Sequence, residues 1–219
     1  MLIERKNGKP IYLLIGRKEF WSSNFIISNE TFIPRSDTER LVEISLNLLK
    51  DSFINKVLDL GTGTGAIAIS IAKERKNSKV LGIDRKNSII KIAKLNARRL
   101  KIKNVRFMKS NWFKSINKYR FHLIVSNPPY ICKNYPNIKE YSKFEPKHSL
   151  VSSSSGLNDI RIIIKKSCKQ LFNNGWLVLE HGYNQGKSVR KLFCDFNYKN
   201  VESFLDYGEK ERVTIGRKP

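Results

Sequence analysis

The chain has 219 residues, and its 42 Lys and Arg against 19 Asp and Glu give a formal net charge of +23 at pH 7. Hydrophobic residues make up 40% and aromatic residues 11%, which excludes a disordered chain and predicts a globular protein with one sizeable core. No apolar run is long enough to span a membrane and the N-terminus has no signal-peptide core, so we expect a cytoplasmic protein without membrane attachment.

Cysteine and charge usage narrow the expectations further. Cys132, Cys168 and Cys194 lie far apart and form no C-x-x-C pair, so we expect neither a disulfide framework nor a metal site. The high charge has two explanations. Lysine is spread along the whole chain with much Ile and Asn, as a biased codon supply would produce, whereas a nucleic-acid partner would also select for basic residues. We favour the first, which leaves a nucleic-acid partner possible but not required.

We expect the first 50 residues to form a linker, a hairpin and a helix that pack on the main domain. The basic segment 1–18 contains an apolar run and suits a linker that docks on that domain. Ser36 or Asp37 can cap the following helix, and Glu39 would complete a capping box with Ser36. Three short apolar segments predict strands in a hairpin or meander: 19–21, 25–27 and 31–33.

Strands and helices then alternate, and we expect residues 51–219 to form one α/β domain. This alternation predicts a doubly wound, mostly parallel, Rossmann-like sheet, and the last two strands should add an antiparallel C-terminal edge. The predicted strands are 56–60, 79–84, 105–108, 121–126, 175–180, 201–205 and 212–216. The predicted helices are 66–73, 88–100, 159–172 and 185–196.

A long stretch between 131 and 156 shows no clear period. It contains two proline turns and a run of four serines. Loops of this length in compact domains are usually functional or mobile. We interpret it as a lid or substrate wall beside Asn127, with a plain linker as the alternative.

The glycine-rich loop 61–65 and Asp84 together predict a nucleoside-cofactor site. The loop follows the first strand of the domain, where glycines allow close backbone approach and a helix begins. Asp84 ends the next strand, where an acidic group accepts hydrogen bonds from a ribose. The glycine spacing alone fits both NAD and S-adenosylmethionine.

The sequence Asn127-Pro128-Pro129-Tyr130 after the strand 121–126 favours S-adenosylmethionine. The two prolines stop the strand in a stiff loop that presents an amide and an aromatic ring. The Asn127 side-chain carbonyl and the Pro128 backbone carbonyl can each accept one hydrogen from a planar amino group. Tyr130 can pack on its flat face. Orienting a poor nitrogen nucleophile toward a sulfonium methyl in this way removes roughly 7–11 kcal/mol of barrier.

These motifs together resemble a known family. Residues 58–67 with Asn127-Pro128-Pro129-Tyr130 look like the class I methyltransferases that act on planar nitrogens. The segments 32–39, 144–146, 179–182 and 211–213 are similar to those of the release factor glutamine methyltransferases, the HemK family. The resemblance covers nearly the whole chain.

The resemblance implies a function and a set of site residues. The family uses S-adenosylmethionine to methylate the side-chain nitrogen of the glutamine in the Gly-Gly-Gln tip of class 1 peptide chain release factors. Asn127 would touch both the cofactor and the glutamine, Pro128, Pro129 and Tyr130 would complete the substrate site, and Asn127, Pro128 and Tyr130 would act in catalysis. The implied cofactor residues are Gly61, Thr62, Gly63, Thr64, Gly65, Asp84, Trp112 and Asn127, with Trp112 flanking the adenine.

One departure and two alternatives qualify this expectation. Family members carry a helical domain ahead of the region at 6–10, so a chain starting inside that linker implies a reduced gene or a late start site, with a weaker grip on the release factor. An N(6)-adenine methyltransferase on RNA or DNA would use the same Asn127 chemistry on a flipped base. A degenerate domain that binds RNA or the ribosome without catalysis is the second alternative. We expect a monomer.

Overall fold

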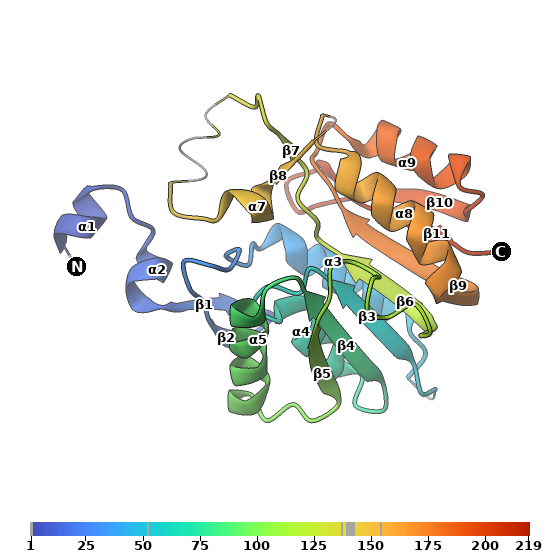
Figure 1. Ribbon diagram of the computed structural model, residues 1–219, viewed down its shortest axis with the longest axis horizontal. Coiled ribbons are helices and arrows are strands. Elements are labelled where there is room, and N and C mark those ends of the chain that lie inside the picture. The colour runs from blue at the N-terminus through green and yellow to red at the C-terminus, as the bar shows by residue number, and fades with distance from the viewer. Residues whose placement is uncertain (1, 52, 137, 139–142, 154) are drawn as a thin grey trace.

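The computed structural model describes residues 2–51, 53–136, 138, 143–153 and 155–219, and its centre is a seven-stranded sheet (Figure 1). The strand order is β10-β11-β9-β6-β3-β4-β5. Every neighbouring pair from β9 to β5 is parallel, and β11 is antiparallel to both its neighbours. The strands are β3 (Lys56–Leu60), β4 (Lys79–Asp84), β5 (Val105–Lys109), β6 (Phe121–Ser126), β9 (Leu171–Glu180), β10 (Lys199–Leu205) and β11 (Glu211–Arg217).

Helices cover both faces of this sheet because successive strand residues point to opposite sides. On β3, Val57 packs in the core that contains α3 (Asp37–Leu48), α4 (Ala66–Glu74) and α5 (Asn87–Arg99). Leu58 and Leu60 pack in a second core that contains α8 (Asn158–Gln170) and α9 (Gly186–Asp195). The predicted doubly wound α/β class is therefore confirmed.

The C-terminal strand pair forms the predicted antiparallel edge, with one refinement. β11 lies between β9 and β10, so the outermost strand is β10 rather than the last strand of the chain. The residues at 171–172, which the periodicity assigns to a helix, instead begin β9. Leu171 pairs with Phe121 of β6, and a register shift follows before the regular ladder resumes, so tertiary pairing overrides the local helical pattern.

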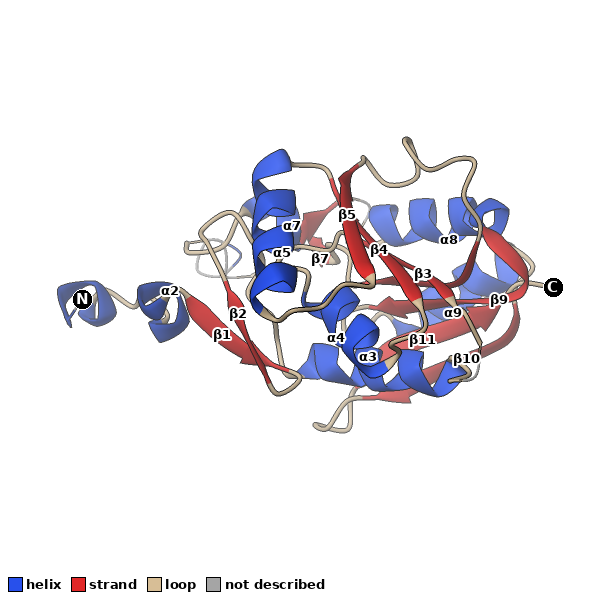
Figure 2. Ribbon diagram, turned by 90° about the horizontal axis from the view of Figure 1, so that it is seen from below, coloured by secondary structure: helices blue, strands red, loops and turns tan. Residues whose placement is uncertain are grey.

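The N-terminal segment departs most from the sequence predictions. The helices α1 (Leu2–Lys6) and α2 (Ile11–Ile15) bury no residue and extend away from the main body in both views (Figures 1 and 2). The antiparallel hairpin of β1 (Arg17–Phe20) and β2 (Ser23–Ile26) forms as predicted. The predicted third strand at 31–33 is wrong: this segment is a loop.

The predicted capping box at α3 is also wrong. Ser36 makes no side-chain capping hydrogen bond. Glu39 instead accepts a hydrogen bond from the backbone N–H of Trp21 at 2.8 Å, which ties the hairpin to α3. The hairpin is held a second time by Asn96 of α5, whose side-chain nitrogen donates to the carbonyls of Ile26 at 3.0 Å and Thr64 at 2.9 Å. One buried amide thus joins the hairpin to the glycine-rich loop.

The stretch 131–156 is only partly described, since 137, 139–142 and 154 lie outside the described residues. In its described part, β7 (Ile131–Cys132) pairs with β8 (Val151–Ser152), and α7 (Lys147–Leu150) precedes β8. Lys147 to Val151 therefore return to the carboxyl end of β6, which is where the prediction of a substrate wall places this stretch. Among the described residues, no helix combines the length and apolar character needed to cross a membrane.

Candidate active site

The candidate site lies where the strand order of the sheet reverses, next to β3. From β3 the chain proceeds to β4 and β5 on one side, and then crosses to β6 on the other side of β3. Ligands of open α/β sheets bind at such a point, beyond the carboxyl ends of the strands. The ends of β3 and β6 are joined at this point, because the Ser126 hydroxyl donates a hydrogen bond to the carbonyl of Leu60 at 2.7 Å.

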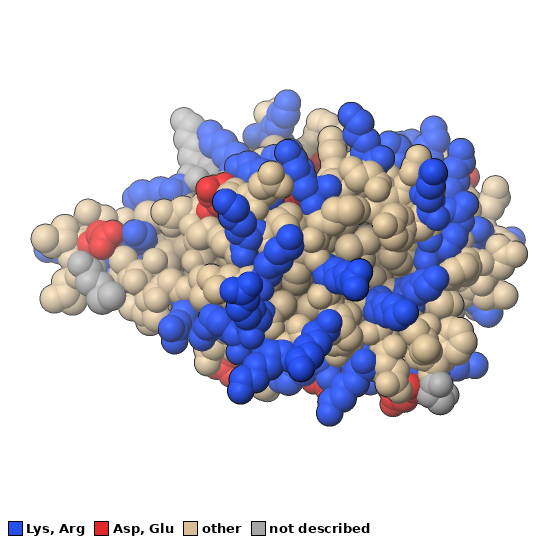
Figure 3. Space-filling view, turned by 60° about the horizontal axis from the view of Figure 1, so that its bottom comes forward, with Lys and Arg blue, Asp and Glu red and all other residues tan. Residues whose placement is uncertain are grey.

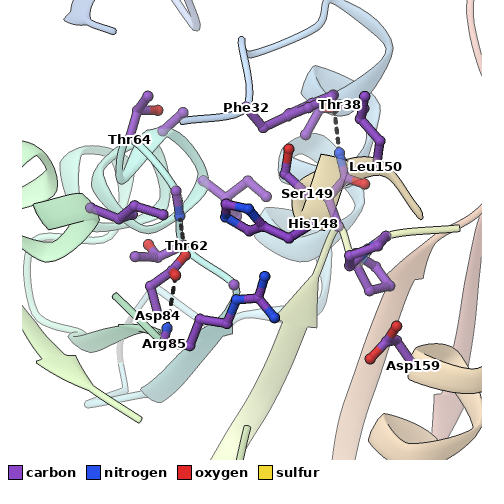
Figure 4. A pocket seen from close by; sticks show the side chains of 18 of the residues that line it. Phe32, Thr38, Thr62, Thr64, Asp84, Arg85, His148, Ser149, Leu150 and Asp159 are labelled. Carbon is purple, nitrogen blue, oxygen red and sulfur yellow. Dashed lines mark hydrogen bonds between the residues drawn. The ribbon is translucent and has the colours of Figure 1, made fainter. Parts of the chain in front are cut away.

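A cavity of about 390 Å³ opens at this point (Figure 4). It brings together the sequence-predicted residues Gly61, Thr62, Gly63, Thr64, Asp84, Trp112, Asn127, Pro128, Pro129 and Tyr130. Gly65 faces the packed core instead, because a Cβ there would lie 3.1 Å from Phe107 and 3.2 Å from Ala93. Its positive φ of 84° ends the loop and starts α4.

A buried carboxylate holds the glycine-rich loop. Asp59, in the middle of the apolar strand β3, is fully buried and accepts a hydrogen bond from the Thr62 hydroxyl at 2.6 Å. Burial raises the pKa of Asp59 to about 7, since desolvation penalises the charged form. Gly82 leaves room for this pair, because a Cβ there would lie 2.6 Å from the Thr62 oxygen. Asp59 is not among the site residues predicted from the sequence, although a charged residue inside an apolar strand is a recognisable signal.

Asp84 lies at the rim of the cavity with its carboxylate braced by backbone amides. Its two oxygens accept hydrogen bonds from the N–H groups of Gly63 at 3.2 Å and Arg85 at 2.7 Å, drawn as dashed lines in Figure 4. Burial raises its pKa above the usual value, and these amides oppose that rise. The carboxylate is therefore fixed in direction at the end of β4, as a ribose-binding acid requires.

Trp112 forms the wall next to the loop. It adopts a positive φ of 46°, which is rare for a bulky residue, and the Ser110 hydroxyl donates to its carbonyl at 2.7 Å. Its ring lies so close to Gly61 that a Cβ on this glycine would be 3.7 Å away. A flat aromatic surface is thereby held beside the glycine-rich loop.

Asn127 is oriented by a residue that is remote in the sequence. Its side-chain nitrogen donates a hydrogen bond to the hydroxyl oxygen of Thr38 at 3.1 Å (Figure 4). Because that oxygen accepts from Asn127, the Thr38 proton is free to point at Glu180, whose pKa the Thr38 hydroxyl lowers. The amide nitrogen of Asn127 is thus occupied, and its carbonyl oxygen remains to accept a hydrogen bond from a ligand.

Glu180 also anchors Tyr130. The Tyr130 hydroxyl donates to the Glu180 carboxylate across 3.4 Å, and Gln185 donates to the Tyr130 carbonyl at 3.0 Å. Burial raises the pKa of Glu180 to about 7. Burial likewise raises the pKa of Tyr130, and the neighbouring Glu180 adds to that rise, so the phenol stays protonated. One buried acid therefore contacts both side chains that flank Asn127.

The N-terminal segment and the stretch after β7 complete the wall. Arg35 forms an ion pair with Glu145, and the second oxygen of Glu145 accepts the Ile33 N–H at 3.0 Å. His148 of α7 extends into the cavity opposite Asp84 (Figure 4). Its pKa is lowered to about 4, first by desolvation and then by the nearby cations Arg85 and Lys86. No local pattern marks contacts between distant segments, and the sequence therefore predicts no site role for four residues of the site: Thr38, Glu145, His148 and Glu180.

The residues present fit an S-adenosylmethionine-sized nucleoside cofactor. The cavity combines a fixed carboxylate, a glycine-rich loop and an aromatic wall, which suit a ribose, an amino-acid moiety and an adenine respectively. Phe32, Pro34 and Pro129 add apolar surface to the same cavity.

Comparison with known proteins identifies the family. The model of a methyltransferase domain matches residues 54–206. A release factor glutamine methyltransferase of Buchnera aphidicola subsp. Schizaphis graminum is 45% identical, and the match covers 99% of this chain and 78% of that protein. The Escherichia coli K12 protein of the same name is 44% identical, with the same coverage.

Solved structures agree at the level of the fold. A methyltransferase from Pyrococcus furiosus superposes with a TM-score of 0.63 at 19% identity, covering 86% of this chain and 88% of its own. The ribosomal protein L11 methylase of Lactobacillus delbrueckii subsp. bulgaricus gives 0.61 at 18% identity, covering 92% and 89%. By its sequence relatives, the chain belongs to the release factor glutamine methyltransferase family.

Proposed function

We propose that this chain transfers a methyl group from S-adenosylmethionine to the side-chain amide nitrogen of the glutamine in the Gly-Gly-Gln motif of class 1 peptide chain release factors. Membership of the release factor glutamine methyltransferase family supports this assignment. The observation that carries it is the hydrogen bond from Asn127 to Thr38, which leaves the Asn127 carbonyl oxygen as an acceptor in the cavity. A primary amide is the substrate group that such an acceptor orients.

The cofactor, when bound, supplies an electrophilic methyl group on a sulfonium. Asp84 would accept hydrogen bonds from the ribose hydroxyls, and Trp112 would flank the adenine. The backbone of Gly61, Thr62, Gly63 and Thr64 would approach the remainder of the cofactor closely. Gly65 contributes indirectly, because the absence of a side chain lets α4 pack against the sheet directly after the loop. These assignments are residue roles inferred from the cavity lining and from the resemblance.

Asn127 and Pro128 act on the substrate. The Asn127 side-chain carbonyl and the Pro128 backbone carbonyl each accept one hydrogen of the glutamine amide, which aims its nitrogen at the methyl group. Tyr130 and Pro129 pack on the amide plane. An amide nitrogen is a poor nucleophile because its lone pair is delocalised, so positioning supplies most of the acceleration. The alkylated nitrogen loses its proton readily, and the step needs no strong base.

We also propose that the first 50 residues belong functionally to the catalytic unit that follows at 51–219. Phe32, Pro34, Arg35 and Thr38 line the same cavity as Asn127. The hairpin is hydrogen-bonded to α3 and α5, so it braces the segment that carries these residues.

Mass spectrometry of the release factor's Gly-Gly-Gln peptide tests the function, after incubation with this chain and S-adenosylmethionine. We expect one added methyl on the glutamine. The variant Asn127→Ala should abolish it, whereas Asn134→Ala, which alters an exposed asparagine outside the cavity, should not. Methyl label that enters only nucleic acid, or cofactor binding by calorimetry without glutamine methylation, would refute the proposal.

A further inference from the structure

In one long part of the chain, every charged residue is a Lys or an Arg. Residues 85–139 contain no Asp or Glu, although the chain has 19, and they hold fifteen Lys and Arg. This part includes α5 and β5, which lie at the bottom of Figure 1. Figure 3 shows that face brought forward, with Lys and Arg spread across it and few Asp and Glu among them. A uniform drift toward lysine does not by itself remove every acid from a quarter of the sequence.

The structure gathers these cations around a groove. Lys94, Arg98 and Arg106 line an open groove between α5 and β5, together with the apolar side chains of Ala97, Ile102, Val105 and Phe107. Lys91 precedes Lys94 and Arg98 at helical spacing, so the three lie on one face of α5. Within the described residues, none of these four cations forms an ion pair.

Other surface helices distribute charge differently. Arg40 pairs with Glu43 on α3 at 2.7 Å, and Lys191 pairs with Asp195 on α9 at 3.0 Å. Structural reasons explain single residues on the basic face. Arg98 lies in the last turn of α5, where a positive charge stabilises the helix, and the charge of Arg106 hinders another chain from pairing with the edge strand β5. They do not explain why the groove lining combines three cations with no acid.

We propose that the groove between α5 and β5 binds the phosphodiester backbone of RNA. The basic surface extends well beyond the three groove residues, as a polymer of phosphates requires and a single phosphate does not (Figure 3). The groove cations carry long flexible side chains that form no ion pair in the part of the chain that the structure describes, which suits contact with the backbone rather than with base edges. The choice of RNA as the polyanion rests on the proposed function, because its protein substrate acts in translation.

Fluorescence anisotropy with a labelled mixed-sequence RNA tests this, using the full chain at several salt concentrations. The groove variant is Lys94→Gln, Arg98→Gln, Arg106→Gln. The matched control is Lys165→Gln, Lys166→Gln, Lys169→Gln on α8, which removes three exposed cations from the other face of the sheet. We expect the groove variant to bind about tenfold more weakly or worse, with a salt slope lower by about 2–3. The control should bind like the wild type.

Three results would overturn the proposal. The first is that the wild type fails to bind RNA near physiological salt, and the second is that both triple variants weaken binding equally. The third is that polyglutamate displaces the labelled RNA as effectively as unlabelled RNA does. Equal weakening would mean that net charge alone drives binding. Both variants should keep wild-type cofactor affinity by calorimetry, which shows that they fold. They should also keep glutamine methylation of an isolated release factor, so a failure of the proposed function is seen separately in the wild type.

Discussion

Replacing Thr38 by valine tests how Asn127 is oriented. Valine keeps the shape of threonine but cannot accept the hydrogen bond that the Asn127 amide nitrogen donates at 3.1 Å. The partly buried amide then loses its acceptor and is free to turn, so the carbonyl oxygen no longer points at the substrate. Holding the amide in its productive orientation without this acceptor costs about 1–3 kcal/mol, and a barrier raised by that amount lowers kcat roughly 5- to 150-fold.

Steady-state kinetics and calorimetry separate this effect from a structural one. Thr38→Ser restores the hydroxyl and should recover most of the lost kcat. Ser45→Ala on the same helix removes a buried hydroxyl that donates to the Leu41 carbonyl, and it should leave kcat unchanged. Cofactor affinity should fall less than kcat in Thr38→Val, because Asp84 and Trp112, to which we assign the ribose and the adenine, are held by other residues than Thr38. Wild-type kcat in Thr38→Val, or an equal loss of cofactor affinity, would refute the reasoning.

Three further predictions follow from the buried groups around the cavity. Asp84→Asn should weaken S-adenosylmethionine binding about tenfold in calorimetry, because a neutral amide is a poorer acceptor for ribose hydroxyls; unchanged affinity would contradict its assigned role. Gly82→Ala should destabilise the protein by about 1–3 kcal/mol in thermal unfolding, since its Cβ would lie 2.6 Å from both Phe107 and the Thr62 oxygen. The pKa of Asp59 rises from 3.8 to about 7 on folding, so its protonated form stabilises the folded state fully below pH 4, and this stability is lost as pH rises through 7. Asp59→Asn should therefore lose less stability than the wild type between pH 5 and pH 8. Parallel curves of unfolding free energy against pH for the two proteins would argue against this shift.

Local patterns were sufficient for the central fold. The apolar strands and the glycine-rich loop are each recognisable from a few consecutive residues. β3 and β6 end at the residues predicted from the alternation of strands and helices. Patterns failed where a long-range partner decides the outcome. Glu39 has the spacing of a capping box, yet it bonds to Trp21, and Leu171 continues a helical period, yet it pairs with Phe121. A single sequence does not reveal which of two competing partners wins.

The same limit separates the predicted site from the observed one. Asn127 and Tyr130 are recognisable from their prolines, but the groups that hold them are not adjacent in sequence. Thr38 is 89 residues from Asn127, and Glu180 is 50 residues from Tyr130. Their side chains are ordinary in local context: Thr38 lies in the first turn of a helix and Glu180 ends a strand.

These contacts change the meaning of the N-terminal segment. Its helix α3 has a complete structural explanation in its apolar face, and nothing in that face requires a threonine at position 38. The cavity does require it, because the direction of the Asn127 amide depends on which group accepts from its nitrogen. Arg35, three residues earlier, pairs with Glu145 and so joins the same segment to the far wall of the cavity. We therefore interpret the segment ahead of the methyltransferase domain as one wall of the proposed catalytic site rather than as an appendage to it.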